Sequence, residues 1–245
     1  ADNLKYLNVL AIFIASLAYS GQNEDYPWLE SLDPEDGYKE SGARLIELNL
    51  GLHPLEGISE KETILLIAVH GGRSPGFEWI YPLQTLDTKE ISTFFYRWND
   101  KGCSLPAAEY LTVQIAEIIK TYPKFEKIIL IGHSYGGVLV SSLVGSWEHS
   151  LPVEIHSVAG PLGGFKPLNT KCNYKPPVYI AKNVTFYQWR TQHHLDGAFK
   201  MLKVDPQIIN LKDSKVVRLP GTYRGRRLGH NWSISWVADE LGRQR

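Results

Sequence analysis

Residues 127–140 read KIILIGHSYGGVLV, and this stretch decides the fold. It begins with a short apolar run, 127–131, typical of a strand buried on both faces. A Gly-x-Ser-x-Gly turn centred on Ser134 follows, and residues 138–140 begin a helix. Glycines two positions either side of the serine leave room for a sharp, strained turn. We therefore expect the Ser134 hydroxyl to be lifted out of a sheet and exposed.

Further apolar runs rich in β-branched residues recur on both sides of this stretch and alternate with helical stretches. Strands that alternate with helices imply right-handed crossovers. The predicted fold class is α/β: a mostly parallel central sheet flanked by helices on both faces. The predicted strands cover residues 44–50, 64–69, 91–96, 127–131, 153–158, 184–189 and 215–219, and the predicted helices cover residues 107–121, 137–147, 196–202 and 233–241.

The segment Gly132-His133-Ser134-Tyr135-Gly136-Gly137 resembles the nucleophile elbow of α/β-hydrolases of the esterase and lipase kind. The resemblance extends upstream to His70-Gly71-Gly72 and downstream to a late histidine, and so covers most of the chain from about Arg44. It implies the α/β-hydrolase fold, with Ser134 as nucleophile of a catalytic triad. In that fold the triad follows the order serine, acid, histidine along the chain.

His230 is the predicted base of this triad. Five histidines follow Ser134, and only His230 comes after the last predicted strand, on the Gly-rich loop 221–229 and ahead of the terminal helix. A residue there can reach the carboxyl ends of the strands, where open α/β sheets bind ligands. The alternatives are an exposed loop histidine or a residue at the helix start.

Asp196 is the predicted acid, because it lies in the loop after the predicted strand 184–189, where the family carries its carboxylate. A carboxylate there fixes the tautomer of the imidazole and stabilises the imidazolium. The alternatives are an N-cap for the following helix, or Asp205 as the acid. His193 and His194 lack the further ligands that a metal site needs, so no metal is predicted.

The predicted oxyanion hole uses the backbone N–H groups of Tyr135, after the nucleophile, and Gly72, in the loop after strand 64–69. The sequence has Arg73 where one esterase group carries a third glycine. The alternative for Gly71-Gly72 is a plain turn at the end of a strand. Arg224, Arg226 and Arg227 precede His230, and this basic cluster is a candidate site for an anionic part of a substrate; the alternative is a solvated loop.

Charge and function class follow from the composition. Lys plus Arg and Asp plus Glu both count 26, so no net field attracts nucleic acid. We expect a small neutral or amphipathic ester substrate, no cofactor, no nucleic acid and no stable membrane span; the oligomeric state stays open.

The predicted function is hydrolysis of carboxylic esters through an acyl-enzyme. A thioesterase, amidase or peptidase with the same triad is the alternative, as is a non-catalytic binding protein of this fold.

The N-terminus resembles a secretory signal: an apolar segment, residues 7–19, follows Lys5 and ends in small residues. We expect residues 1–20 to be a signal peptide and residues 21–245 to form a single domain, with a lid-like irregular segment at 160–182. The predicted location is therefore periplasmic or secreted. If the apolar segment is instead part of the fold, the protein is cytoplasmic. In an exported protein Cys103 and Cys172 could form one disulfide; the alternative is two unpaired thiols.

Overall fold

The computed structural model describes residues 28–244, so the predicted signal peptide at 1–20 lies outside the described residues. A seven-stranded sheet runs through the domain in the order β1-β3-β2-β4-β5-β6-β7. All neighbouring strands are parallel except β1, which pairs antiparallel with β3. The strands are β1 Gly51–Pro54, β2 Ile64–Val69, β3 Ile91–Arg97, β4 Lys127–His133, β5 Val153–Val158, β6 Val184–Arg190 and β7 Lys215–Arg218.

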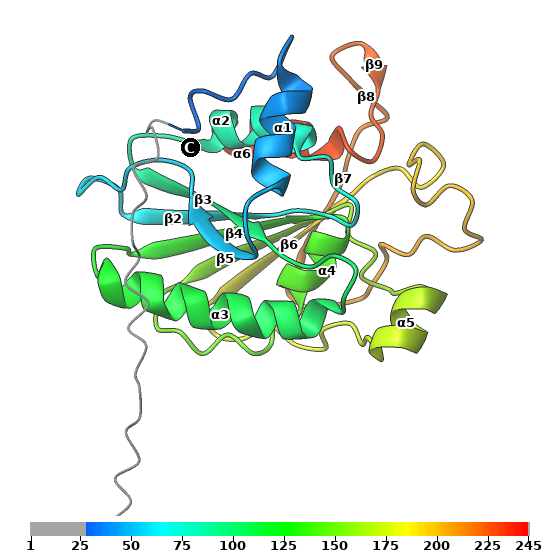
Figure 1. Cartoon of the computed structure of the whole chain (residues 1–245). Helices are drawn as coiled ribbons and strands as arrows, with labels where there is room; N and C mark the ends of the chain where they lie inside the picture. Colours follow the sequence, from blue (N-terminus) through cyan, green and yellow to red (C-terminus); the bar gives the residue numbers. More distant parts are fainter. Residues whose placement is uncertain (1–27, 245) are drawn as a thin grey trace, which may run out of the picture.

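Helices cover both faces of the sheet (Figure 1). Helices α3 and α4 lie on one face, and α1, α2 and α6 lie on the other, with α5 beside the carboxyl ends of the strands. No helix within residues 28–244 has the length and apolarity to cross a membrane. The helices are α1 Tyr38–Ile46, the 3-10 helix η1 Phe77–Trp79, α2 Ile80–Leu86, α3 Ser104–Thr121, α4 Tyr135–Ser141, α5 Lys166–Cys172 and α6 Ser233–Arg243.

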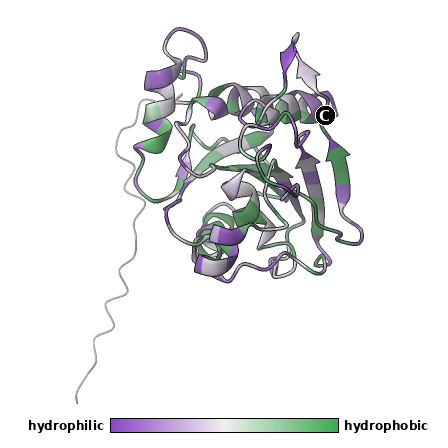
Figure 2. Ribbon diagram, turned by 90° about the vertical axis from the view of Figure 1, so that its right-hand side faces the viewer, coloured by the Kyte–Doolittle hydropathy of each residue, from purple (hydrophilic) through white to green (hydrophobic). Residues whose placement is uncertain are grey.

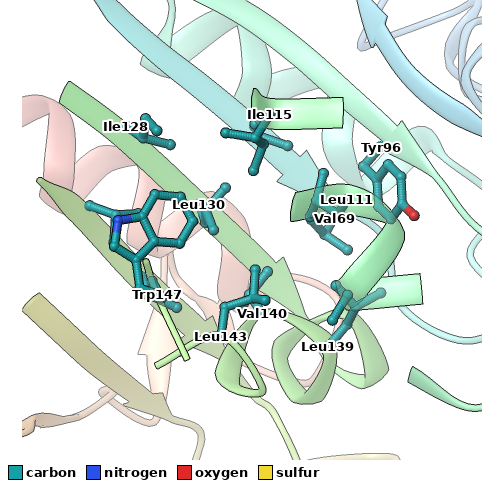
Figure 3. Close-up of a cluster of buried hydrophobic side chains, with 14 of the residues drawn as sticks. Val69, Tyr96, Leu111, Ile115, Ile128, Leu130, Leu139, Val140, Leu143 and Trp147 are labelled. Atoms are coloured by element: carbon teal, nitrogen blue, oxygen red, sulfur yellow. The ribbon is translucent and has the colours of Figure 1, made fainter. Parts of the chain in front are cut away.

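The strands are buried on both sides because successive side chains contribute to different cores. In β4, Ile128 and Leu130 pack under α3 and α4 against Ile115 and Val140 (Figure 3). The intervening Ile129 belongs to the opposite core with α1, α2 and α6. Figure 2 shows the resulting pattern, with hydrophobic residues on the central strands. This explains why the strands lack the alternation of a half-exposed sheet.

Two of the predicted elements are wrong. Residues 44–50 are not a strand: α1 extends through Ile46, and β1 begins at Gly51. Gly42 sets this helix against η1, since a Cβ on Gly42 would lie 2.4 Å from the backbone nitrogen of Phe77. Residues 196–202 form turns rather than a helix. The reason is local, because the Asp196 side chain accepts the Ala198 N–H and thereby closes a turn.

Two loops contain structure that the sequence did not predict. The segment 160–182 includes α5, and Cys172 at its end forms a disulfide with Cys103 just before α3. The Gly-rich loop 221–229 is a hairpin of β8 Thr222–Tyr223 and β9 Arg226–Arg227, turning at Gly225 with φ +72°. Both features lie at the carboxyl end of the sheet (Figure 1).

Candidate active site

Ser134 lies at the sharp turn between β4 and α4. Its φ of +55° and ψ of −118° are a conformation that non-glycine residues avoid. The flanking glycines make the turn possible. A Cβ on Gly132 would lie 2.2 Å from the Gly136 carbonyl oxygen, and a Cβ on Gly136 would lie 2.2 Å from the Val69 carbonyl oxygen. The expected strained turn is therefore present, and it leaves Ser134 partly exposed.

His230 follows the β8–β9 hairpin and comes just before α6. Its Nδ1 lies 2.9 Å from Oδ2 of Asp196. An ionised carboxylate can only accept, so Nδ1–H donates and Nε2 keeps its lone pair. This tautomer is the one that a general base requires.

Asp196 is completely buried. Besides His230, Thr191 Oγ1 contacts its Oδ2 at 2.5 Å, and the Ala198 N–H donates to its Oδ1 at 2.8 Å. Burial by itself raises the pKa of Asp196. The hydrogen bonds from His230, Thr191 and Ala198 and the electrostatic interaction with His230 outweigh burial, so the pKa of Asp196 lies below its ordinary value. The carboxylate is therefore ionised at neutral pH.

His133, the residue before Ser134, connects the elbow to the His230 loop. Burial and the nearby His230 lower the pKa of His133 to about 3, so its ring is neutral. Its Nε2–H donates to the His230 carbonyl at 3.0 Å, and the two ring centroids are 4.8 Å apart. The contact holds His230 beside the residue that precedes Ser134.

The loop after β2 approaches the elbow at Gly71 and Gly72. A Cβ on Gly71 would lie 3.0 Å from the Ser134 Cβ, so a glycine favours this close approach. His70, whose pKa burial lowers to about 4, donates from Nδ1–H to the Gly71 carbonyl at 2.8 Å. The C=O and N–H of a trans peptide point in opposite directions. This bond therefore orients the Gly72 N–H away from the His70 ring.

A pocket of about 900 Å³ opens at Ser134, Tyr135 and Gly72. This volume is typical of small-molecule sites. One part of its wall is mainly apolar, and another part is polar and charged. The first part includes Pro161, Phe165, Ala198, Phe199 and Leu202, and the second includes Arg73, Ser74, Arg97, Asp100 and Lys101.

The structure thus brings Asp196 and His230 into contact and places Ser134, Tyr135 and Gly72 on one pocket. Each lies in a segment that follows β2, β4, β6 or β7, at the carboxyl edge of the sheet. Because the strand order reverses at β2, this edge is also where such folds bind ligands. Sequence reasoning missed Thr191, His133 and the orienting role of His70. Their contacts join loops that are far apart in the chain or depend on side-chain direction.

The alternative residues take other positions. Asp205 does not contact His230; its side chain is 8% exposed, lies 3.6 Å from Arg218 and accepts two bonds from Gln207. His193 Nε2 bonds with the Phe199 carbonyl at 2.8 Å. Arg224 stacks on two tyrosine rings and bonds Asp239, away from the residues that line the pocket. Within residues 28–244 no group of side chains could hold a metal ion.

Comparison with known proteins supports the fold. No protein-family model matches the chain. A thioesterase-like protein of Silicibacter sp. TM1040 superposes with a TM-score of 0.51 at 20% identity, covering 90% of this chain and 91% of that one. An α/β serine hydrolase without a lid from Xanthomonas campestris gives 0.50 at 15% identity, with 79% and 87% covered. The esterase domain of a Rhodothermus marinus protein gives 0.50 at 12% identity, with 79% and 89% covered.

One curated relative matches in sequence. The proline iminopeptidase of Saccharolobus solfataricus is 30% identical over 130 residues, which are 49% of this chain. The match spans only 39% of the iminopeptidase's own length. Together with the sheet order and the strained turn after β4, these likenesses identify the chain as a protein of the α/β-hydrolase fold.

Proposed function

We propose that the protein is a serine hydrolase that cleaves carboxylic esters through an acyl-enzyme. Ser134 attacks the carbonyl carbon, and His230 Nε2 takes the hydroxyl proton. The alkoxide leaves with that proton, and water then releases the acid from the serine by the same steps. The backbone N–H groups of Gly72 and Tyr135 would stabilise the oxyanion, a role in which one donor contributes about 100- to 1,000-fold in rate.

The observation that carries this proposal is the bond between the buried Asp196 carboxylate and His230, whose Nδ1 and Oδ2 are 2.9 Å apart, with His133 joining His230 to the elbow. A buried carboxylate that is paired and hydrogen-bonded, and that holds one imidazole tautomer beside a pocket, is typical of a functional site. Ser134 is the nearby hydroxyl on a strained turn. The pocket at this serine has space for both parts of a small ester.

The test is turnover of 4-nitrophenyl esters from acetate to palmitate by the wild type and by Ser134→Ala. We expect the hydrolysis to depend on Ser134. Turnover by the variant should be at least 1,000-fold slower than by the wild type, on the order of the loss of a triad member. Its melting temperature should be within a few degrees of the wild type, because the hydroxyl adds little to packing. Unchanged turnover by the folded variant would contradict the proposal.

Peptide or amide hydrolysis is the second candidate, and the match to the proline iminopeptidase supports it. The same serine, histidine and carboxylate serve amide cleavage, in which His230 protonates the leaving amine. Aminoacyl 4-nitroanilides, prolyl included, separate the two functions. Hydrolysis of prolyl 4-nitroanilide with a higher kcat/KM than any ester in the series would favour the peptidase.

A further inference from the structure

The charged part of the pocket wall is cationic. Arg73, Arg97 and Lys101 line the pocket, and Asp100 is the only acidic residue among those that line it. The Asp100 carboxylate already accepts the Arg73 backbone N–H at 2.5 Å. Across the whole chain the acidic and basic residues are equal in number. Positive charge is thus concentrated at the pocket of an otherwise balanced protein.

Arg97, at the end of β3, is the most constrained of these cations. Its Nε–H donates to the Ile46 carbonyl at 2.7 Å. Its Nη1 donates to the Trp98 carbonyl at 2.5 Å and lies 3.1 Å from Nε2 of His70, which is neutral and accepts. Three of the five guanidinium N–H groups are therefore used. Both N–H groups of Nη2 lack a hydrogen-bond partner within residues 28–244.

Arg97 also lacks a counter-charge. None of the ion pairs found among residues 28–244 includes it. The side chain is half-buried and held by three backbone or ring acceptors, so little conformational entropy is lost when a ligand binds. A fixed guanidinium with two free N–H groups in a concave site is suited to a carboxylate or phosphate oxygen.

We propose that Arg97 binds an anionic group, a carboxylate or phosphate, on the substrate. The inference rests on the proposed function, whose pocket it shares. Arg73 and Lys101 add positive charge, and the apolar wall at Phe165, Phe199 and Leu202 takes the rest of the substrate. The balanced composition pointed to a small neutral or amphipathic substrate, whereas the local charge of the pocket favours an anionic ester.

The test compares matched esters that differ in charge. On the acyl side, 4-nitrophenyl hydrogen adipate is compared with 4-nitrophenyl hexanoate. On the alcohol side, 4-acetoxybenzoate and 4-acetoxyphenyl phosphate are compared with methyl 4-acetoxybenzoate. Each kcat/KM is divided by the rate constant of alkaline hydrolysis of the same ester. We expect the anionic ester to be preferred in either the acyl-side or the alcohol-side comparison. The comparison that shows the preference identifies which part of the ester carries the anion and whether it is a carboxylate or a phosphate.

Arg97→Met should lower that anionic-to-neutral ratio by roughly tenfold to a hundredfold, mainly through KM, because one charge-assisted contact is lost. Arg97→Lys should retain part of the preference. Arg243→Met is the matched control, since Arg243 is exposed at the end of α6 and does not line the pocket. Its ratio should equal that of the wild type. In the wild type the preference should also weaken as salt concentration rises.

Two results would overturn the inference: Ser134-dependent hydrolysis with no anionic preference in either arm, or a preference that Arg97→Met leaves unchanged. In the first case the proposed function still stands. If no ester is hydrolysed, the proposed function fails. Calorimetry then tests the anion site by itself, by comparing the binding of monomethyl adipate and dimethyl adipate to Ser134→Ala. Tighter binding of the anion supports the site, and equal binding refutes it. The same calorimetry and the salt dependence apply if Arg97→Met does not fold.

Discussion

The Asp196 carboxylate is the most constrained group of the candidate site. It is buried, and it accepts from His230, Thr191 and the Ala198 backbone. A buried charge is tolerated only where such donors replace water. The hydrogen bonds hold Asp196 in one orientation, and Asp196 in turn fixes the imidazole. Loss of its charge should therefore affect catalysis more than the fold.

Asp196→Asn should preserve folding and lower kcat by up to roughly 10,000-fold near neutral pH, because an amide can donate to His230 and hold the wrong tautomer. Asp213→Asn is the matched control. Asp213 is exposed before β7 with φ +66°, a conformation that Asn also adopts. We would measure kcat for both on one ester from pH 6 to 9. A mild loss at Asp196 equal to that at Asp213 would remove Asp196 from the mechanism.

At this scale the candidate residues that could be proposed from the sequence are those whose position is tied to a strand end. Ser134, Asp196 and His230 each follow an apolar run, and the order of elements brings those ends together. The positioning residues were not predictable. His133 bonds a carbonyl that is 97 residues away, and the Thr191 hydroxyl reaches Asp196 across the loop that follows β6.

At the scale of elements, the disulfide joins two walls of the pocket. Cys103 follows Lys101 on the charged wall, and Cys172 ends α5, which follows Phe165 on the apolar wall. Tyr135 packs between them, with its hydroxyl donating to the Gly102 carbonyl at 2.8 Å. Disulfides persist in oxidising compartments, so this bond fits the proposed export of the protein.

Replacing both cysteines by serine should lower the free energy of unfolding by about 4 kcal/mol, the chain-entropy value for a 69-residue separation. KM should rise as well, because α5 is then no longer fixed to the opposite wall. Thermal melts of the wild type, with and without reductant, and of the double variant measure the effect. Equal melting temperatures in all three samples would show that the disulfide contributes nothing to stability.

Burial determined which strands and helices could be predicted from the sequence. Strands that are buried on both faces, such as β2 and β5, have the predicted bounds. A short continuous apolar run is typical of such a strand. Residues 46–50 alternate apolar and polar side chains like a strand, yet α1, which packs closely on η1 at Gly42, continues to Ile46. The local periodicity of a sequence does not reveal packing contacts of this kind between distant segments.

At the scale of the whole molecule, a carboxyl pair at the amino end of the sheet makes stability depend on pH. Burial raises the pKa of Glu56 to about 8, and the neighbouring Asp87 contributes in the same direction. The unfolded chain releases this proton near the ordinary value of 4.5. The folded state therefore holds more protons between these two values, and stability falls as pH rises from about 4.5 to 8.

Glu56→Gln should remove most of this dependence. The amide oxygen can still accept the Thr93 N–H, which donates to Glu56 Oε1 at 3.0 Å, and no charge develops at high pH. We expect the melting temperature of the variant to exceed that of the wild type increasingly from pH 5 to pH 9. Parallel melting curves across this range would refute the assigned role of Glu56. Glu60→Gln, at an exposed glutamate nearby, is the control.

The central claim is that Ser134 is a nucleophile activated by His230 and Asp196. Intact-protein mass spectrometry after exposure to a fluorophosphonate tests it most directly, because the reagent labels an activated serine whatever the natural substrate. The account predicts a single adduct on the peptide that contains Ser134. The adduct should be absent in Ser134→Ala and should form at least 100-fold more slowly in His230→Ala, on the order of a lost general base. An unlabelled wild type, or an adduct on any other serine, would contradict it.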